Sequence, residues 1–164
     1  MLELLRGLSL FTATMLTGAM TGVFGIYANA IMPGLRTTDD RTFVGAFQAM
    51  DRAIINPAFM LAFLGALVVS GAAAGLNAGE RSVLWWVAAA FVLYLVVVVI
   101  TLAVNVPLND ALKAAGDPER IADLGAVRDQ FDEARWVAWN IVRAVLSAVA
   151  FGCLAWALVE YGRA

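Results

Sequence analysis

The chain has 164 residues, of which 62% are hydrophobic and only 15% are charged. Soluble domains are roughly 45–50% apolar and about 25% charged, so this composition excludes an ordinary water-soluble enzyme and a disordered segment. A net charge of −2 provides no basic surface for nucleic acid. The chain contains one cysteine, Cys153, and no histidine, so it lacks the commonest general base and metal ligand of proteins.

Four apolar stretches are each long enough for a membrane-spanning helix, which needs about 20 mostly apolar residues. They predict spans at residues 7–32, 57–78, 83–106 and 134–160. The first stretch is much longer than the roughly 7–15-residue core of a secretory signal, so we expect it to remain in the protein as a helix. The sequence therefore predicts one all-α domain, residues 1–164, folded as an antiparallel bundle of four transmembrane helices.

The two long connections, residues 34–56 and 107–135, contain helical patterns of their own. In the first, Asp39 or Asp40 is the predicted N-cap of a helix. Its apolar stripe has helical spacing and comprises Phe43, Phe47, Met50 and Ile54. In the second, residues 116–119 predict the start of an acidic helix that continues into the fourth span.

With four spans and a tight turn at residues 77–81, both long loops lie on one side of the membrane and both termini on the other. The loop side has seven Lys or Arg residues and the terminal side has three. The positive-inside rule therefore predicts that loops 34–56 and 107–135 face the cytoplasm, in the inner membrane of a bacterial cell.

The fourth span carries a charged residue well inside its apolar stretch, Arg143. An arginine at the centre of a membrane helix costs about 2.5–3.5 kcal/mol on insertion scales, so we expect Arg143 to face the bundle interior or a wet cavity. It belongs to a stripe at i, i+3, i+4 and i+7 that comprises Trp136, Trp139, Asn140 and Arg143. The alternative is an interfacial tryptophan belt, with an arginine that extends to the membrane surface.

Further asparagines and prolines flank the two long loops. The third span ends in Asn105-Val-Pro-Leu-Asn109, where Pro107 removes a backbone donor and frees carbonyl groups near Ala103. The corresponding residues around the first loop are Asn29, Pro33, Asn56 and Pro57. All of these positions lie at one membrane face, whereas the opposite end of the bundle is mainly Leu, Val and Ala. This asymmetry predicts a site at the loop-side end.

The residue types at this face suit an anionic small molecule. Zinc, iron and haem sites use clustered His, Cys or carboxylate ligands, and the spans offer only Cys153, so we expect no metal and no cofactor. The remaining side chains are amide donors and one fixed positive charge. Such a set is suited to stabilise an oxyanion in a dry pocket.

Four segments of the chain are Met32-Pro33-Gly34-Leu35, Asn56-Pro57, Asn105-Val-Pro-Leu-Asn109 and Trp136-x-x-Trp139-Asn140-x-x-Arg143. Together they resemble the anthrone oxygenase-like family of small four-helix integral membrane proteins, many of unknown function, over nearly the whole chain. The resemblance implies oxidation of an anthrone to an anthraquinone by molecular oxygen, with no metal or organic cofactor.

The resemblance also implies roles for the residues at the loop-side face. The predicted catalytic residues, which stabilise the oxyanion or take the proton, are Arg143, Asn140, Asn109 and Asp110, with Asp51 as the second candidate base. The predicted substrate-binding residues are Trp136, Trp139, Asn105, Asn56 and Asn29. The two tryptophans would stack on a flat aromatic substrate.

The leading interpretation is thus a cofactor-independent oxygenase of a lipophilic aromatic or phenolic compound. The first alternative is a non-catalytic binding or carrier protein for the same ligands, which needs no base and is therefore favoured by the missing histidine. The second alternative is an assembly or scaffold subunit that uses its glycine faces and the acidic second loop as partner surfaces. The expected partners are the lipid bilayer and a lipophilic small molecule, with no nucleic acid, and the sequence is compatible with a homo-oligomer.

Overall fold

The computed structural model describes residues 1–163, and every regular element in this range is helical. The first long helix consists of α1 (Leu2–Ile26), the π-helical segment η1 (Tyr27–Ile31) and α2 (Met32–Arg36). The next helices are α3 (Asp40–Ile54) and α4 (Pro57–Leu76). A second continuous helix consists of α5 (Arg81–Ile100), η2 (Thr101–Asn105) and α6 (Val106–Ala114). The last two helices are α7 (Leu124–Phe131) and α8 (Glu133–Tyr161).

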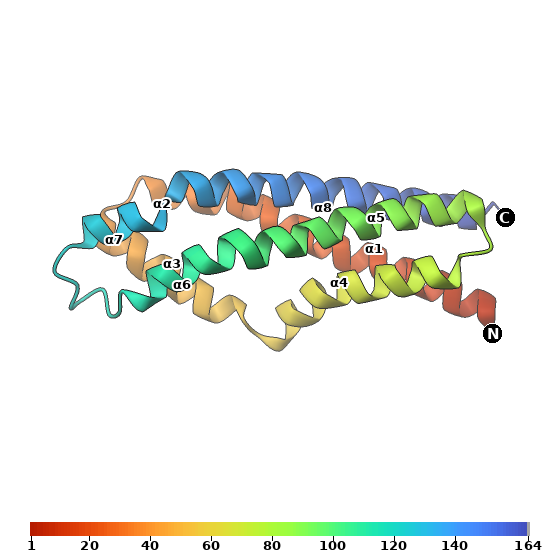
Figure 1. Ribbon diagram of the computed structural model, residues 1–164, viewed down its shortest axis with the longest axis horizontal. Helices are drawn as coiled ribbons and strands as arrows, with labels where there is room; N and C mark the ends of the chain where they lie inside the picture. Colours follow the sequence, from red (N-terminus) through yellow and green to blue (C-terminus); the bar gives the residue numbers. More distant parts are fainter. Residues whose placement is uncertain (164) are drawn as a thin grey trace.

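Four segments are long and apolar enough to cross a membrane: Leu2–Arg36, Pro57–Leu76, Arg81–Ala114 and Leu124–Tyr161. Both α1 and α5 pack against α4 and α8, and successive spans run antiparallel (Figure 1). The two termini lie at one end of the molecule, and α3, α6 and α7 lie at the other (Figure 1). The predicted fold class, an all-α membrane bundle with helical loops on one side, is confirmed.

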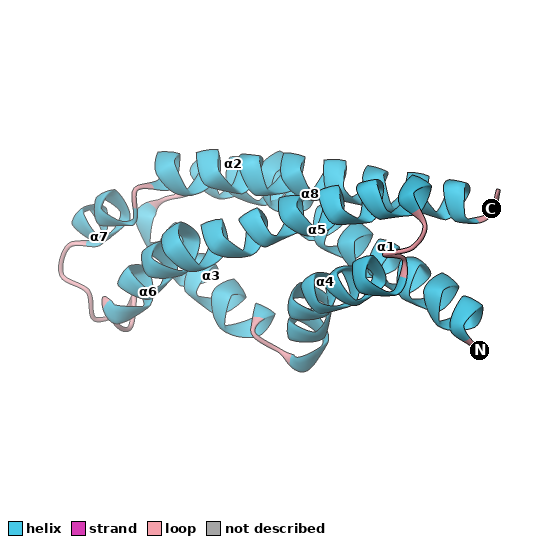
Figure 2. Ribbon diagram, turned by 45° about the vertical axis from the view of Figure 1, so that its right-hand side comes forward, coloured by secondary structure: helices cyan, strands magenta, loops and turns pink. Residues whose placement is uncertain are grey.

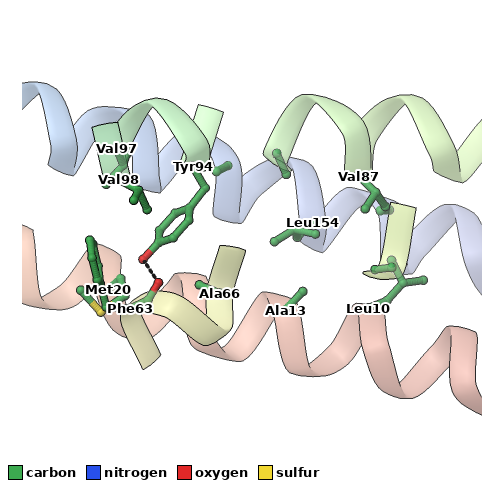
Figure 3. Packing of buried hydrophobic residues seen from close by; sticks show 14 of the residues in the cluster. Leu10, Ala13, Met20, Phe63, Ala66, Val87, Tyr94, Val97, Val98 and Leu154 are labelled. Atoms are coloured by element: carbon green, nitrogen blue, oxygen red, sulfur yellow. Dashed lines mark hydrogen bonds between the residues drawn. The ribbon is translucent and has the colours of Figure 1, made fainter. Parts of the chain in front are cut away.

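Small side chains let the helices approach closely in the centre of the bundle. Ala66 belongs to the buried cluster, which Figure 3 shows between the four long helices. The Tyr94 hydroxyl donates a hydrogen bond of 3.1 Å to the Phe63 carbonyl and links α5 to α4 (Figure 3). A Cβ on Gly18 would lie 2.9 Å from the Phe151 ring, so this glycine permits the close contact of α1 and α8. Such packing is the main source of helix association in a membrane.

A second buried apolar cluster holds α3 against the loop-side end of the bundle. It comprises Met32, Phe43, Val44, Phe47, Leu112, Phe131 and Trp136. Arg128 of α7 fastens the beginning of α3, because its guanidinium donates to Asp40 Oδ1 at 3.0 Å and to the Thr38 carbonyl at 3.1 Å. The same guanidinium lies 4.2 Å from the centroid of the Phe43 ring. The first long loop is therefore a helix that covers one end of the bundle.

Asp39 is the N-cap of α3, as one of the two predicted alternatives has it. Its carboxylate accepts a hydrogen bond of 2.9 Å from the backbone N–H of Thr42. The backbone and side-chain hydrogen bonds from Thr42 lower the pKa of the Asp39 carboxyl below its ordinary value. The cap thus favours the ionised carboxylate.

Several boundaries differ from those that the sequence predicts. The first long helix runs over Leu2–Arg36 rather than residues 7–32. The third long helix does not end at residue 106 but continues past Pro107 to Ala114, because η2 accommodates the proline. In the second loop, residues 118–120 form a turn, and α7 begins at Leu124. A left-handed residue, Asp132 with φ 50°, then separates α7 from α8, so the predicted continuous acidic helix is broken.

Candidate functional site

A cavity of about 110 Å³ lies between the long helices and α3, at the loop-side end of the bundle. Its lining residues from the first half of the chain are Val23, Phe24, Tyr27, Phe47, Asp51, Ile54, Ile55 and Phe59. Its lining residues from the second half are Thr101, Asn105, Val106, Asn109, Trp136, Asn140 and Arg143. Figure 2 shows α3, α6 and α7 together at this end of the molecule.

Arg143 is buried in the wall of this cavity, with only 5% of its surface exposed. Its guanidinium donates to Asn140 Oδ1 at 2.9 Å and to the Thr101 hydroxyl at 3.2 Å. The guanidinium carbon lies 4.6 Å from the centroid of the Phe24 ring. The Nε–H has no partner, and among residues 1–163 no carboxylate forms an ion pair with this side chain. The cavity wall therefore contains a buried cation that has no ion-pair partner within the described residues.

Asn140 fixes the position of Arg143. Its amide Nδ2 donates a hydrogen bond of 3.1 Å to the Phe24 carbonyl on α1, and its Oδ1 accepts the one from Arg143. Asn140 is completely buried. This pair of bonds connects α8 to α1 and leaves the amide little freedom to turn.

A chain of hydrogen bonds leads from α8 to the carboxylate of Asp51 on α3. The Trp136 indole N–H donates to Asn109 Oδ1 at 2.7 Å, and Asn109 Nδ2 donates to Asp51 Oδ1 at 2.7 Å. Lys113 Nζ lies 3.0 Å from Asp51 Oδ2 and 2.8 Å from Asp110 Oδ1. Asp51 is only 7% exposed, so a carboxylate with fixed orientation faces the same cavity as Arg143.

The two π-helical segments border this cavity. Each is followed, after one further residue, by a proline, Pro33 or Pro107. Proline has no N–H, and its ring collides with the carbonyl four residues earlier in a regular α-helix, so a wider turn relieves the collision. In each segment the N–H of the next residue donates to the carbonyl of the first one, Tyr27 or Thr101. Both of these first residues line the cavity.

A family model described as anthrone oxygenase matches residues 43–153, which is more than half of the chain. The chain belongs to the anthrone oxygenase family. The matched region runs from α3 into α8 and includes Asp51, Asn109 and Arg143, whereas the cavity wall formed by α1 and η1 precedes it. No curated protein and no solved structure matches the chain. The predicted resemblance to this family is confirmed over residues 43–153, which contain three of the four segments, whereas Met32-Pro33-Gly34-Leu35 precedes the match.

The structure brings five of the nine predicted site residues to the cavity wall. They are Arg143, Asn140, Asn109, Asn105 and Trp136. Asn105 is buried, and its amide Nδ2 donates to the Trp136 carbonyl at 3.3 Å.

The other four predicted residues do not line the cavity. The Asp110 side chain is 59% exposed and pairs with Lys113 on the outer surface. Trp139 is 38% exposed and lies outside the cavity wall. Asn56 is exposed and acts as the N-cap of α4, accepting from the Phe59 N–H at 3.0 Å. Asn29 is exposed on η1.

Sequence reasoning ranked Asp51 behind Asp110 and missed Phe47, Tyr27 and Thr101. The signal for Asp51 is its spacing, because it follows Phe47 by four residues and so lies on the apolar face of α3. Tyr27 and Thr101 carry no local signal apart from the prolines that follow them. Within residues 1–163, no three His, Cys, Asp or Glu side chains are grouped closely enough to hold a metal ion.

Proposed function

We propose that this protein binds a lipophilic aromatic phenol or anthrone as its oxyanion and oxygenates it with molecular oxygen, without a cofactor. Arg143 is the observation that carries the proposal. It lines the cavity, is buried, and has no carboxylate partner within the described residues. A buried charge is costly unless it is paired, and the oxygen of a bound anion supplies the missing partner.

Two charged groups of the cavity wall would perform different parts of the reaction. Arg143, oriented by Asn140, stabilises the negative charge that develops on the ligand oxygen. Asp51, oriented by Asn109, takes the proton from the carbon that is oxidised. We propose Asp51 as the base in preference to Asp110, because only Asp51 lines the cavity.

The reaction converts anthrone and O2 into anthraquinone and water. Asp51 removes one of the two hydrogens of the methylene carbon, and the resulting anthrolate passes one electron to O2. The radical pair then forms a carbon–oxygen bond, and the peroxide anion takes a proton back from Asp51. Loss of the second methylene hydrogen together with hydroxide breaks the O–O bond and leaves the new carbonyl and one water molecule.

The aromatic lining supports a flat ligand. Phe47 and Trp136 meet edge to face, with ring centroids 5.5 Å apart, and Phe24 lies beneath Arg143. Aromatic faces of this kind pack well against planar rings. We propose Trp136 as the stacking residue, since Trp139 does not line the cavity.

One observation favours the non-catalytic alternative, a binding or carrier protein for the same anions. Asp51 is already engaged, because it accepts a hydrogen bond from Asn109 and forms an ion pair with Lys113. A carboxylate occupied by two such partners is less accessible to a proton on a substrate carbon. The alternative keeps the same cavity and the same role for Arg143 but has no turnover.

Oxygen uptake by the protein in lipid nanodiscs supplied with anthrone tests the proposal. The oxygen uptake of empty nanodiscs is first subtracted. We then expect Arg143→Gln to lower the remaining uptake by about 10²–10³-fold, the usual effect of removing one oxyanion donor. Arg163→Gln is the matched control, because Arg163 pairs with Glu160 at the far end of the bundle. Unchanged uptake in Arg143→Gln contradicts the proposal. Binding of anthrone that depends on Arg143 but consumes no oxygen supports the carrier instead.

We further propose that both long loops face the cytoplasm of a bacterial cell, since their side has seven Lys or Arg residues against three. A single cysteine at Arg120, in a Cys153→Ala background, tests the orientation. We expect a membrane-impermeant maleimide to label this cysteine only after the cells are opened. Labelling of intact cells overturns the orientation.

A further inference from the structure

The cavity wall changes character between its inner part and its outer part. Arg143, Asn140, Asn105 and Asp51 are all buried and form a polar inner part. Ile55 is the lining residue with the greatest exposure, at 60%. It marks the place where the cavity reaches the surface of the protein.

The cavity-lining residues closest to Ile55 in the chain are apolar, whereas the exposed Asn56 does not line the cavity. Ile54, Phe59 and Val106 line the cavity and are partly exposed. An opening that admits ligands from water usually carries polar groups around its rim, whereas an exposed apolar rim on a membrane protein is compatible with hydrocarbon.

The opening also lies beside the spans. Ile55 is two residues before Pro57, at which the second candidate span begins, and Val106 is inside the third candidate span, Arg81–Ala114. In Figures 1 and 2 alike, the connection between α3 and α4 lies at the outer edge of the molecule. The exposed side chains that follow on α4 are apolar, Met60 and Leu61.

The volume of the cavity limits how a ligand fits. Sites for small molecules usually have about 300–1,000 Å³. A cavity of about 110 Å³ takes one ring of a fused aromatic system rather than the whole system. The other rings must then extend outward past Ile55 and Phe59.

We propose that the cavity opens sideways into the bilayer at Ile55, and that its ligand is a fused-ring phenol dissolved in the membrane, which enters and leaves through the lipid. The oxygen-bearing ring reaches Arg143, and the remaining rings stay between Ile55, Phe59 and the acyl chains. This inference rests on the proposed function for the identity of the ligand, but the position of the opening is independent of it.

Spin-label accessibility tests where the opening lies. In a Cys153→Ala background, labels are placed at Ile55 and, as references, at Leu61 on the exposed face of α4 and at Arg120 in the second loop. In nanodiscs we expect the label at residue 55 to collide with lipid-soluble oxygen as the label at residue 61 does. A label at residue 55 that instead meets a water-soluble nickel complex, as at residue 120, overturns the proposal.

The rate of ligand association tests the route, because an equilibrium constant does not depend on the path. We expect Ile55→Trp to slow anthrone association from preloaded vesicles by about tenfold, with no such change in Leu61→Trp. Equal association rates in the two variants overturn the lipid route even if binding still depends on Arg143, in which case the proposed function stands. If neither the wild-type protein nor any variant binds anthrone, the proposed function fails, and the spin labels alone decide whether the cavity opens into the lipid.

Discussion

The two halves of the chain, before and after the turn at residues 77–80, build one cavity from different side chains. The first half contributes seven apolar or aromatic residues and a single carboxylate, Asp51. The second half contributes Arg143, Thr101, three asparagines, Trp136 and Val106. An apolar wall with one acidic group therefore lies opposite a polar wall with one basic group. A ligand that has both an apolar ring system and an ionisable oxygen is complementary to these two walls.

A π-helical turn that precedes a proline occurs in both halves, but it orients different residues. In η1 and in η2 a π-helical turn precedes a proline, and in each the first residue lines the cavity. Asn29 is the third residue of η1 and is exposed, whereas Asn105 is the fifth residue of η2 and is buried. Two positions correspond to about half a helical turn. The proline therefore induces the wide π-helical turn, and the position of an asparagine within that turn decides whether the asparagine faces the cavity.

The largest expected effect comes from removing the one carboxylate of the first half. Asp51→Asn should lower anthrone turnover by about 10²–10⁴-fold while the ligand still binds, because a general base is lost and Arg143 remains. Asp110→Asn is the matched control, since both carboxylates lie near Lys113 Nζ but Asp110 is outside the cavity. Oxygen uptake and anthrone binding measured on the same samples check it. Equal losses of turnover in the two variants would exclude Asp51 as the base.

The two prolines should differ when each is replaced by alanine. In Pro107→Ala the restored N–H lets η2 return to a regular α-helix, which rotates Thr101 against Asn109 by about 100°. We expect anthrone affinity to fall about tenfold, because Arg143 loses its hydrogen bond to Thr101. Pro33→Ala leaves that bond intact and should have a smaller effect. Fluorescence titration with anthrone measures the affinity of both variants. A larger loss of affinity in Pro33→Ala than in Pro107→Ala would show that η1, rather than η2, is the more important segment for binding.

Replacing Asn105 or Asn29 should change the free energy of unfolding by different, small amounts. Asn105→Leu removes the hydrogen bond to the Trp136 carbonyl between the third long helix and α8, and should cost about 0.6–1.7 kcal/mol of unfolding free energy. Asn29→Leu should cost nothing measurable, because Asn29 is exposed. Unfolding in mixed detergent micelles measures both. Equal stability of the two variants would show that the buried hydrogen bond contributes no net stability.

The smallest expected effect concerns the cap of α3 and depends on pH. Hydrogen bonds from Thr42 lower the pKa of Asp39 in the folded protein, so the cap stabilises α3 above the ordinary carboxyl pKa near 4. This stabilisation is lost as the pH falls through the lowered pKa. Hydrogen exchange of α3 amides should therefore become faster in acid for the wild type. Asp39→Asn keeps the cap without a titrating group, and we expect its α3 protection to change less between neutral and acidic pH.

The sequence predicted which site residues share a face of a single helix. Trp136, Asn140 and Arg143 are spaced by four and three residues, so they share one face of a helix wherever that helix packs. The stripe is wide, however, and Trp139 belongs to it as well. The packing of Trp136 on Phe47 of α3 and Phe131 of α7 decides that Trp136 is buried, whereas Trp139 is exposed. Periodicity identifies a face, but only the neighbouring helices decide which edge of that face is covered.

The all-α membrane bundle follows from the amino-acid sequence alone, because each of the four long apolar spans must satisfy its backbone hydrogen bonds internally in lipid. The sequence also determined that an arginine and several asparagines gather at the loop-side end. The packing of the helices on one another, by contrast, brings Asp51 rather than Asp110 to the cavity that Arg143 lines, and makes Asn56 a helix cap. The reason is that α3 is placed by its packing on Phe131 and Trp136 and by its contacts with Arg128, which are far from it in the sequence.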